Sequence, residues 1–183
     1  MKKPIAILAT LLFCAMAAQN ATAQTHLGPH AIGMQLGIVS PENSDAAVGF
    51  GVFADMGTLT PSIRLLSHLD YWSKSVDSPF GGSATVGDVA LTARGEYMFP
   101  VRTPRVQPFA GAGLGMHFLH AKVETPGFPD ITDSSTKLGL DMGGGFAMPV
   151  NPRTDFRTEM WYGIVDGLNQ LSIKAGLAFK LGS

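Results

Sequence analysis

Three glycines recur at every second position of the stretch QPFAGAGLGMHFLHAK, at Gly111, Gly113 and Gly115. Glycines bind phosphate when they are spaced as G-x-G-x-x-G, or in a P-loop that ends in Lys-Ser or Lys-Thr and opens a helix. The stretch has neither spacing, and no helical pattern follows it. We therefore reject a nucleotide site and predict no cofactor. A period of two is instead typical of one face of a β-strand.

The five histidines are the next candidates for chemistry, as metal ligands. Zinc sites place their ligands at short, regular spacings along the chain. Here His26 and His30 lie in an N-terminal segment, while His68, His117 and His120 are scattered over two apolar segments. We therefore predict no metal site and no catalytic residues.

Acidic and basic residues also recur inside apolar segments, in equal numbers. A charge in a low-dielectric interior persists only when it is paired, because an isolated buried charge is costly. We interpret these residues as one paired charge network that fills an interior, a structural plug rather than an open pore. We assign nine residues to the network: Arg64, Asp70, Arg94, Glu96, Lys137, Asp141, Arg157, Glu159 and Lys174. Asp55, Asp155 and Lys180 complete the count of six acidic and six basic residues.

The N-terminus predicts export. Two lysines precede the apolar run PIAILATLLFCAMAA, and Ala21-Thr22-Ala23 offers small residues for a signal peptidase. We predict a signal peptide at residues 1–23, cleaved before Gln24. The mature protein is then a single domain at 24–183. A membrane anchor is the alternative, but an anchor needs about 20 uninterrupted apolar residues. A lipoprotein at Cys14 is disfavoured, because Phe13 stands where a small residue should precede the acylated cysteine.

Composition then narrows the class of protein. Removal of two of the 13 basic residues with the signal leaves 11 against 14 acidic residues, a net charge of −3 that excludes a nucleic-acid binder. Glycine numbers 22, charged residues are 15% of the chain, and mean hydropathy is +0.18. No later apolar run is long enough for a transmembrane helix. Only helices and closed barrels satisfy every backbone group in lipid, which favours a barrel.

Eight segments test this idea, since a transmembrane barrel strand alternates apolar lipid-facing residues with small or polar lumen-facing ones. In each segment the charges and most glycines fall in one phase and the large apolar residues in the other. A soluble barrel would show the inverse arrangement. We predict an all-β fold, an eight-stranded antiparallel up-and-down transmembrane β-barrel, with apolar phases at 32–38, 48–56, 63–71, 89–99, 110–118, 138–148, 156–164 and 171–181.

The connections predict the orientation. Short links, GTLT, PVRTPR and VNPRT, are expected at the periplasmic end with both termini. Two longer loops, 73–86 and 123–135, are expected outside, where an extracellular ligand would bind. Asp166-Gly167 is the favoured pair for a two-residue hairpin turn. That turn places Glu159 opposite Lys174 and predicts an ion pair between them.

Aromatic residues supply a further check. Amphipathic rings gather where a barrel meets the two membrane interfaces. Ordinary core aromatics are the alternative interpretation. We predict a girdle of Tyr71 and Tyr162 at the outer end and of Tyr97, Phe99 and Phe179 at the periplasmic end.

QPFAGAGLGMHF, LGLDMGGGFAMPVNPRTDFRTEMWY and LSIKAGLAFKLG together resemble the small outer-membrane β-barrel superfamily, which includes the transmembrane domain of outer-membrane protein A and the protein W and X types. Pro108-Phe109 before the alternating glycines, Gly143 to Gly145, and Glu159 match features of that group. The resemblance implies a bacterial outer-membrane location, contact with outer-membrane lipids, and assembly by periplasmic chaperones and the barrel-insertion machinery. We expect a monomer.

Three functions remain open. A structural or surface-interaction role is favoured, a narrow porin is second, and a lipid A-modifying enzyme is third. For the enzyme, His120 near the outer end of its strand is the one candidate. The lipid A deacylases carry a His-x-Ser pair that HAK at 120–122 lacks, so we expect no enzyme.

Overall fold

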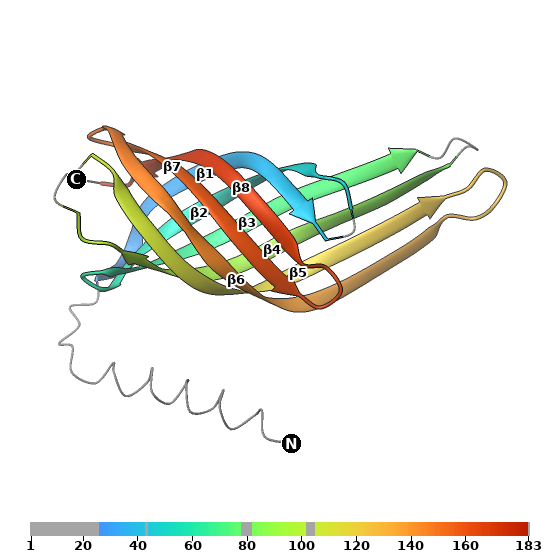
Figure 1. Cartoon of the computed structure of the whole chain (residues 1–183), viewed down its shortest axis with the longest axis horizontal. Helices are drawn as coiled ribbons and strands as arrows, with labels where there is room; N and C mark the ends of the chain where they lie inside the picture. The colour runs from blue at the N-terminus through green and yellow to red at the C-terminus, as the bar shows by residue number, and fades with distance from the viewer. Residues whose placement is uncertain (1–25, 43, 78–81, 102–104, 183) are drawn as a thin grey trace, which may run out of the picture.

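The computed structural model describes residues 26–42, 44–77, 82–101 and 105–182. These residues form eight β-strands in chain order (Figure 1). Their bounds are β1 His26–Pro41, β2 Ala47–Thr60, β3 Ile63–Asp77, β4 Ser83–Met98, β5 Gln107–Glu124, β6 Ile131–Asn151, β7 Thr154–Val165 and β8 Gln170–Lys180.

Each strand pairs antiparallel with its neighbours in sequence, and β1 pairs with β8 to close the barrel. This confirms the predicted fold. The first strand begins and the last strand ends at one end of the barrel, here named the proximal end; the opposite end is the distal end (Figure 1). The links at the proximal end are 61–62, 99–106 and 152–153. The predicted link GTLT belongs to β2, and the turn follows it at Pro61 and Ser62.

The alternation of side chains is the physical basis of the barrel. Along β1 the apolar residues from Ile32 to Ile38 are exposed at every second position, while Gln35 between them is buried. The same pattern runs along β2, where Phe50 and Val52 point outward and Phe53 and Asp55 are buried. An apolar exterior around a polar interior is stable only where lipid surrounds the barrel. The predicted phases are confirmed.

The alternating glycines of β5 lie on the lumen face, each opposite a residue of β4. Gly113 pairs with Arg94, and Gly111 pairs with Glu96. A Cβ atom added to Gly113 would lie 2.7 Å from Cγ of Arg94, closer than real Cβ atoms approach another heavy atom. The glycines therefore make room in the lumen for the long side chains of β4.

The two predicted long loops are mostly strand, which corrects the prediction. Pairing of β3 with β4 continues to Asp77 and Ser83, and pairing of β5 with β6 continues to Val123 and Ile131. β4 and β5 also stay paired, so four strands extend beyond the rim of the barrel as one sheet (Figure 1). We name residues 73–77, 83–87, 119–124 and 131–137 the distal sheet. Ser, Thr and Gly gave these segments the composition of loops, while backbone pairing makes them strands.

The turn between β7 and β8 has the predicted register. Leu168 N–H donates to Val165 O at 3.0 Å, and Gly167 has a φ of +85°, in the left-handed region that favours glycine. Glu159 pairs with Lys174 across the strands. The turn sequence thus positions both strands.

The predicted signal peptide at 1–23 lies outside the described residues and stays a prediction. Among the residues that the structure describes, no helix has the length and the apolar character to cross a membrane.

Candidate functional site

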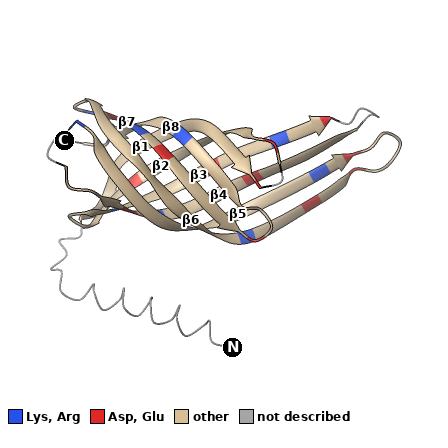
Figure 2. Cartoon of the chain, viewed as in Figure 1, with Lys and Arg blue, Asp and Glu red and all other residues tan. Residues whose placement is uncertain are grey.

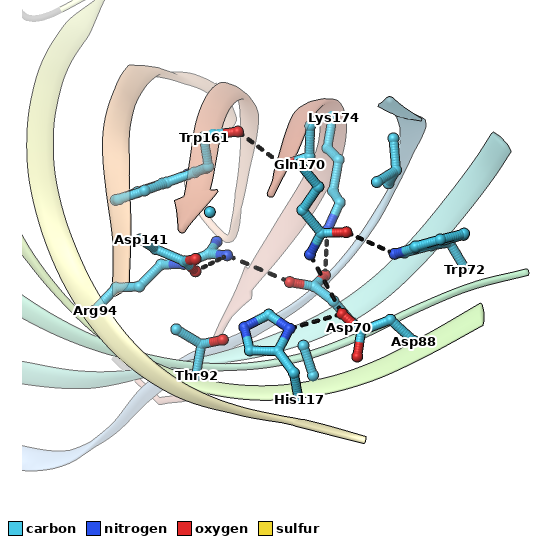
Figure 3. Close-up of a pocket in the computed structure, with 14 residues that line it drawn as sticks. Asp70, Trp72, Asp88, Thr92, Arg94, His117, Asp141, Trp161, Gln170 and Lys174 are labelled. Atoms are coloured by element: carbon cyan, nitrogen blue, oxygen red, sulfur yellow. Dashed lines mark hydrogen bonds and ion pairs between the residues drawn. The ribbon is translucent and has the colours of Figure 1, made fainter. Parts of the chain in front are cut away.

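Arg94 of β4 is buried and pairs with three carboxylates of the charge network, and Figure 3 shows it with two of them, Asp141 and Asp70. Its Nη2 donates to Asp141 Oδ2 at 2.9 Å and lies 3.4 Å from Asp70 Oδ2, and its Nη1 lies 3.3 Å from Glu159 Oε1. The guanidinium carbon also stands 4.4 Å from the ring centre of Trp161. One cation thus joins carboxylates from three other strands, and such planar, multidentate pairing is characteristic of arginine.

Arg157 of β7 forms the second centre, nearer the proximal end. Its Nη2 donates to Glu96, and its Nε donates to Glu159 Oε2 at 2.8 Å. Its guanidinium carbon also stands 3.9 Å from the ring centre of Phe109 and 5.7 Å from that of Phe53. Glu159 therefore bridges the two arginine centres.

Lys174 departs from the predicted pairing. It faces the same lumen as Glu159, but its Nζ lies 2.5 Å from Asp70 Oδ1 on the opposite side of the barrel. The predicted Glu159–Lys174 ion pair is therefore wrong. Glu159 accepts from both arginines, and Asp70 accepts a further hydrogen bond from Gln35 at 3.0 Å. In a narrow lumen, a partner on the far side can lie as close as a neighbour on the next strand. Lys174 therefore pairs with Asp70 across the lumen and not with Glu159 beside it.

Two residues of the predicted network lie at the rims instead. Arg64 pairs with Asp55 at the proximal end, 3.3 Å from Nε to Oδ2. Lys137 pairs with Asp166 in the distal turn at 2.8 Å, and this contact lowers the pKa of the exposed Asp166 carboxyl below 3.8. The other seven are buried together in the lumen: Asp70, Arg94, Glu96, Asp141, Arg157, Glu159 and Lys174.

A second buried cluster of polar side chains, around Asp88 and His117, was not predicted from the sequence. His117 Nδ1 lies 2.7 Å from Asp88 Oδ2, and the same oxygen accepts from Gln170 Nε2 at 3.3 Å. Gln170 in turn accepts from the indole of Trp72 at 2.8 Å. The signal was present in the sequence, because Asp88 shares its phase with Arg94 and Glu96 on β4. Phase alone could have placed it in the lumen.

A small apolar cluster, here named the apolar cap, lies at the distal end of the lumen near this group. Val39, Ala47 and Trp72 are buried together, with Val86 and Leu168 packed against them. Beneath the cap lies a polar cavity of about 20 Å³, enough for roughly one water molecule. Four buried polar atoms of its lining have no protein partner: Asp88 Oδ1, Thr92 Oγ1, His117 Nε2 and Trp161 Nε1. Buried polar atoms of this kind are usually satisfied by ordered water.

The chemistry of this lumen is unfavourable for a metal. His68, Glu96 and Glu159 bring three ligand atoms within 4.8 Å of one another. However, Arg94 Nη1 lies 3.3 Å from His68 Nδ1, so this nitrogen acts as the acceptor and Nε2 carries the proton. A metal on Nε2 would move that proton to Nδ1, where it would face a guanidinium donor.

His120 does not acquire a catalytic partner. Its ring covers Gly87 of β4, on the outward face at the distal end. Ser134 is its neighbour on β6, the opposite side from Gly87. Among the described residues, no hydrogen bond to the His120 ring is formed.

The predicted girdle residues all lie exposed on the barrel exterior. Tyr71 packs against Phe50 with ring centres 5.4 Å apart towards the distal end. Tyr97 and Phe99 form an edge-to-face pair at 5.2 Å near the proximal end. Tyr162 and Phe179 are exposed on β7 and β8 in the predicted phases.

Comparison with known proteins agrees with this architecture. The attachment invasion locus protein Ail of Yersinia pestis has a TM-score of 0.60 and 13% identity over 84% of this chain and 97% of its own. Neisserial surface protein A has a TM-score of 0.57 and 19% identity over 82% and 96%. A major outer membrane protein of Thermus thermophilus has a TM-score of 0.56 and 15% identity over 83% and 100%. These likenesses show a shared fold.

Curated protein sequences contain no match to the chain. A family model described as outer membrane protein beta-barrel domain matches residues 5–180. The chain belongs to this family and is an integral β-barrel protein of the outer membrane.

Proposed function

We propose that the protein has a structural and surface-interaction role, with the distal sheet as its recognition surface. The observation that carries this proposal is an inversion of polarity along β3 to β6. Within the barrel, lumen-phase residues are polar and outward residues are apolar. In the distal sheet the lumen phase becomes mainly apolar, with Val76, Ala84, Val86, Leu119, Ala121, Val123 and Ile131.

The opposite face of the distal sheet is polar. It carries Ser73, Ser75, Ser83, Thr85, His120, Lys122, Glu124, Thr132, Ser134 and Thr136. A polar outward face does not suit lipid, so the membrane ends near Tyr71 and the distal sheet stands in water. Exposed apolar residues in water mark an interaction surface, and Val76, Val123 and Ile131 are 51%, 44% and 70% exposed.

The edges of the distal sheet support the same role. β2 pairs with β3 only as far as Trp72, and β7 pairs with β6 only from Gly139. The backbone groups on the outer edge of β6 from Ile131 to Leu138 thus lack a strand partner among the described residues. Soluble proteins usually protect such edges, and unprotected edges can accept an added strand.

The charge of the distal end restricts the partner. Seven acidic residues stand there against Lys74, Lys122 and Lys137 (Figure 2): Glu42, Asp45, Asp77, Glu124, Asp130, Asp133 and Asp166. One crystal structure of Ail is of its complex with sucrose octasulfate, a heparin analogue. For this chain we propose a partner that is not a polyanion, because the acidic excess would repel one.

The test uses proteoliposomes of the refolded protein and their binding to immobilised extracellular-matrix proteins. The variant Val76→Thr/Val123→Thr/Ile131→Thr should reduce binding at least tenfold. The matched control, Ser75→Ala/Thr132→Ala on the polar face, should bind as the wild type does. Equal binding by both variants would contradict the proposed surface.

A narrow porin is the alternative function. We propose that the paired charges and the apolar cap prevent conduction, since an eight-stranded barrel is just wide enough for its own side chains. Single-channel recordings should show no conductance steps, and regular steps would favour the porin. We further propose a monomer, delivered by periplasmic chaperones and inserted by the barrel-insertion machinery.

We also propose that the protein is not an enzyme. Mass spectra of lipid A from cells that express the protein should be unchanged. A mass change that His120→Ala abolishes would instead establish the lipid A-modifying activity.

A further inference from the structure

The proximal half of the lumen is hollow, in contrast to the filled distal half. A cavity of about 300 Å³ opens at the proximal end between β1, β2, β3, β6, β7 and β8. This volume is at the lower end of the range for small-molecule sites. Its wall combines apolar groups, among them Phe53, Leu66, Ala147 and Ala178, with the basic side chains of Arg64 and Lys180.

Arg64 presents an unused hydrogen-bonding fork to this cavity. It contacts Asp55 through Nε, at 3.3 Å from Oδ2. The other oxygen of Asp55 accepts from the Gly57 N–H at 2.9 Å, which holds the carboxylate in place. The two Nη nitrogens of Arg64 have no partner among the described residues, and paired N–H groups of this kind bind a carboxylate or phosphate in bidentate fashion.

Lys180 adds a second cation at the mouth. Its Nζ lies 2.8 Å from Asp155 Oδ1, and its side chain is 42% exposed. Lys180 also borders a neighbouring groove with Arg153. An ammonium carries three donors, so Lys180 with one carboxylate partner retains donors for an incoming anion.

The inner end of the cavity meets the second arginine centre. Arg157 lines it there, and the guanidinium pairs with Glu96 through Nη2 and with Glu159 through Nε and lies over Phe109. Phe53 is stacked on His68 behind the wall, with ring centres 5.4 Å apart. A molecule that enters from the proximal end therefore meets the side chains of Arg157 and Phe53.

We propose that this cavity is a binding site for a small organic anion, a carboxylate or phosphate ester with a short apolar group. The anionic head would bind the Nη fork of Arg64 beside Lys180. The apolar group would pack against Phe53, Leu66 and Ala178. In the orientation that the short links predict, the site opens to the periplasm, and its ligand is either a free solute or an inner-leaflet phospholipid headgroup.

The binding test uses nuclear magnetic resonance of the refolded protein in phosphatidylcholine nanodiscs, titrated with acetate, butyrate or butylammonium. The amide signals of Gly57 and Ala178 report the site. Each buried CH₂ group contributes about 0.8 kcal/mol, or roughly fourfold in affinity, so butyrate should bind about 15 times more tightly than acetate. Butylammonium should cause no shift. Equal shifts with butyrate and butylammonium, or none with butyrate, would overturn the proposal.

Two variants test separately the contact with the anionic group of the ligand and the space for its apolar group. Arg64→Gln removes the fork and should weaken butyrate binding at least tenfold. Ala178→Phe fills the cavity without a change of charge and should abolish binding. Lys122→Gln, at the distal end, is the matched control and should bind as the wild type does. Heat-modifiable gel migration verifies that each barrel is folded, and wild-type affinity in both cavity variants would refute the site.

Competition between butyrate and an anionic lipid in the nanodisc distinguishes the two possible sources of the ligand. If phosphatidylglycerol in the nanodisc lowers the apparent affinity for butyrate, a phospholipid headgroup occupies the same site. If the affinity is unchanged, the site takes a free solute. Either result is consistent with the anion chemistry of the cavity.

Discussion

Arg94→Met removes the centre of the lumen network and keeps an unbranched side chain in its place. The consequence can be worked out for each partner. Asp70 retains Lys174 and Gln35, and Glu159 retains Arg157. Asp141 loses both of its hydrogen bonds, at 3.2 and 2.9 Å, because both come from Arg94. One buried carboxylate is therefore left without a partner.

Removal of one member of a buried ion pair costs about 3–5 kcal/mol. Arg94 and Asp141 are both almost fully buried, at 3% and 4% exposure, so this range applies without a reduction for solvent screening. With a urea dependence of about 2 kcal/mol per molar, the unfolding midpoint should fall by roughly 2 M. The measurement is reversible urea unfolding in phospholipid vesicles, followed by tryptophan fluorescence.

A double-mutant cycle tests the cause. Asp141→Asn alone leaves Arg94 with two carboxylates and should cost only about 1–3 kcal/mol. In the Arg94→Met background the same change removes the uncompensated charge and should restore stability. The reasoning is refuted if Arg94→Met costs less than about 1 kcal/mol, as at an exposed pair, or if the two changes are additive.

Three further predictions concern backbone space and surface charge. Gly113→Val forces a side chain against Arg94 and should destabilise by about 1–3 kcal/mol in the same unfolding assay; Gly95→Ala, whose Cβ would meet only a carbonyl 3.9 Å away, is the control and should be nearly neutral. Gly167→Ala strains a residue at φ +85° and should cost about 1–2 kcal/mol; an unchanged midpoint would contradict the assigned turn. Lys137→Gln should raise the pKa of Asp166 towards 3.8 in a carboxyl titration by nuclear magnetic resonance, because Lys137 lowers this pKa in the folded protein. The stabilisation that the Lys137–Asp166 pair gives the fold is therefore present above pH 3.8 and is lost as the pH falls through the folded pKa. An unchanged pKa in the variant would disprove the pairing.

The alternation of side chains was enough to predict the barrel, because lipid and lumen demand opposite chemistry from neighbouring residues. Register could be predicted only where a local signal existed. Asp166-Gly167 fixes the pairing of β7 with β8, and Glu159 indeed lies opposite Lys174. Such local signals act over a few residues and were read correctly.

Contacts across the lumen could not be predicted in the same way. Lys174 pairs with Asp70, 104 positions earlier in the numbering, since closure of the barrel brings β3 and β8 to within a side-chain length of each other. The distal sheet was missed for another reason. Its polarity inverts beyond Trp72, so a search for one continuous phase ends there, although the backbone pairing of β3 with β4 continues.

The distribution of large and small lumen residues explains why the two halves of the barrel differ. Glycines on β5 and β6, such as Gly113 and Gly139, leave space that Arg94 and His117 occupy, so the distal half is filled by long polar side chains. Nearer the proximal end, lumen positions carry the small residues Ala147 and Ala178, and both line the cavity. Arg157 lies at the boundary, where it pairs with Glu96 and Glu159. The same charges that should prevent conduction thus form the floor of a binding site, and a variant that opens the plug should also weaken that site.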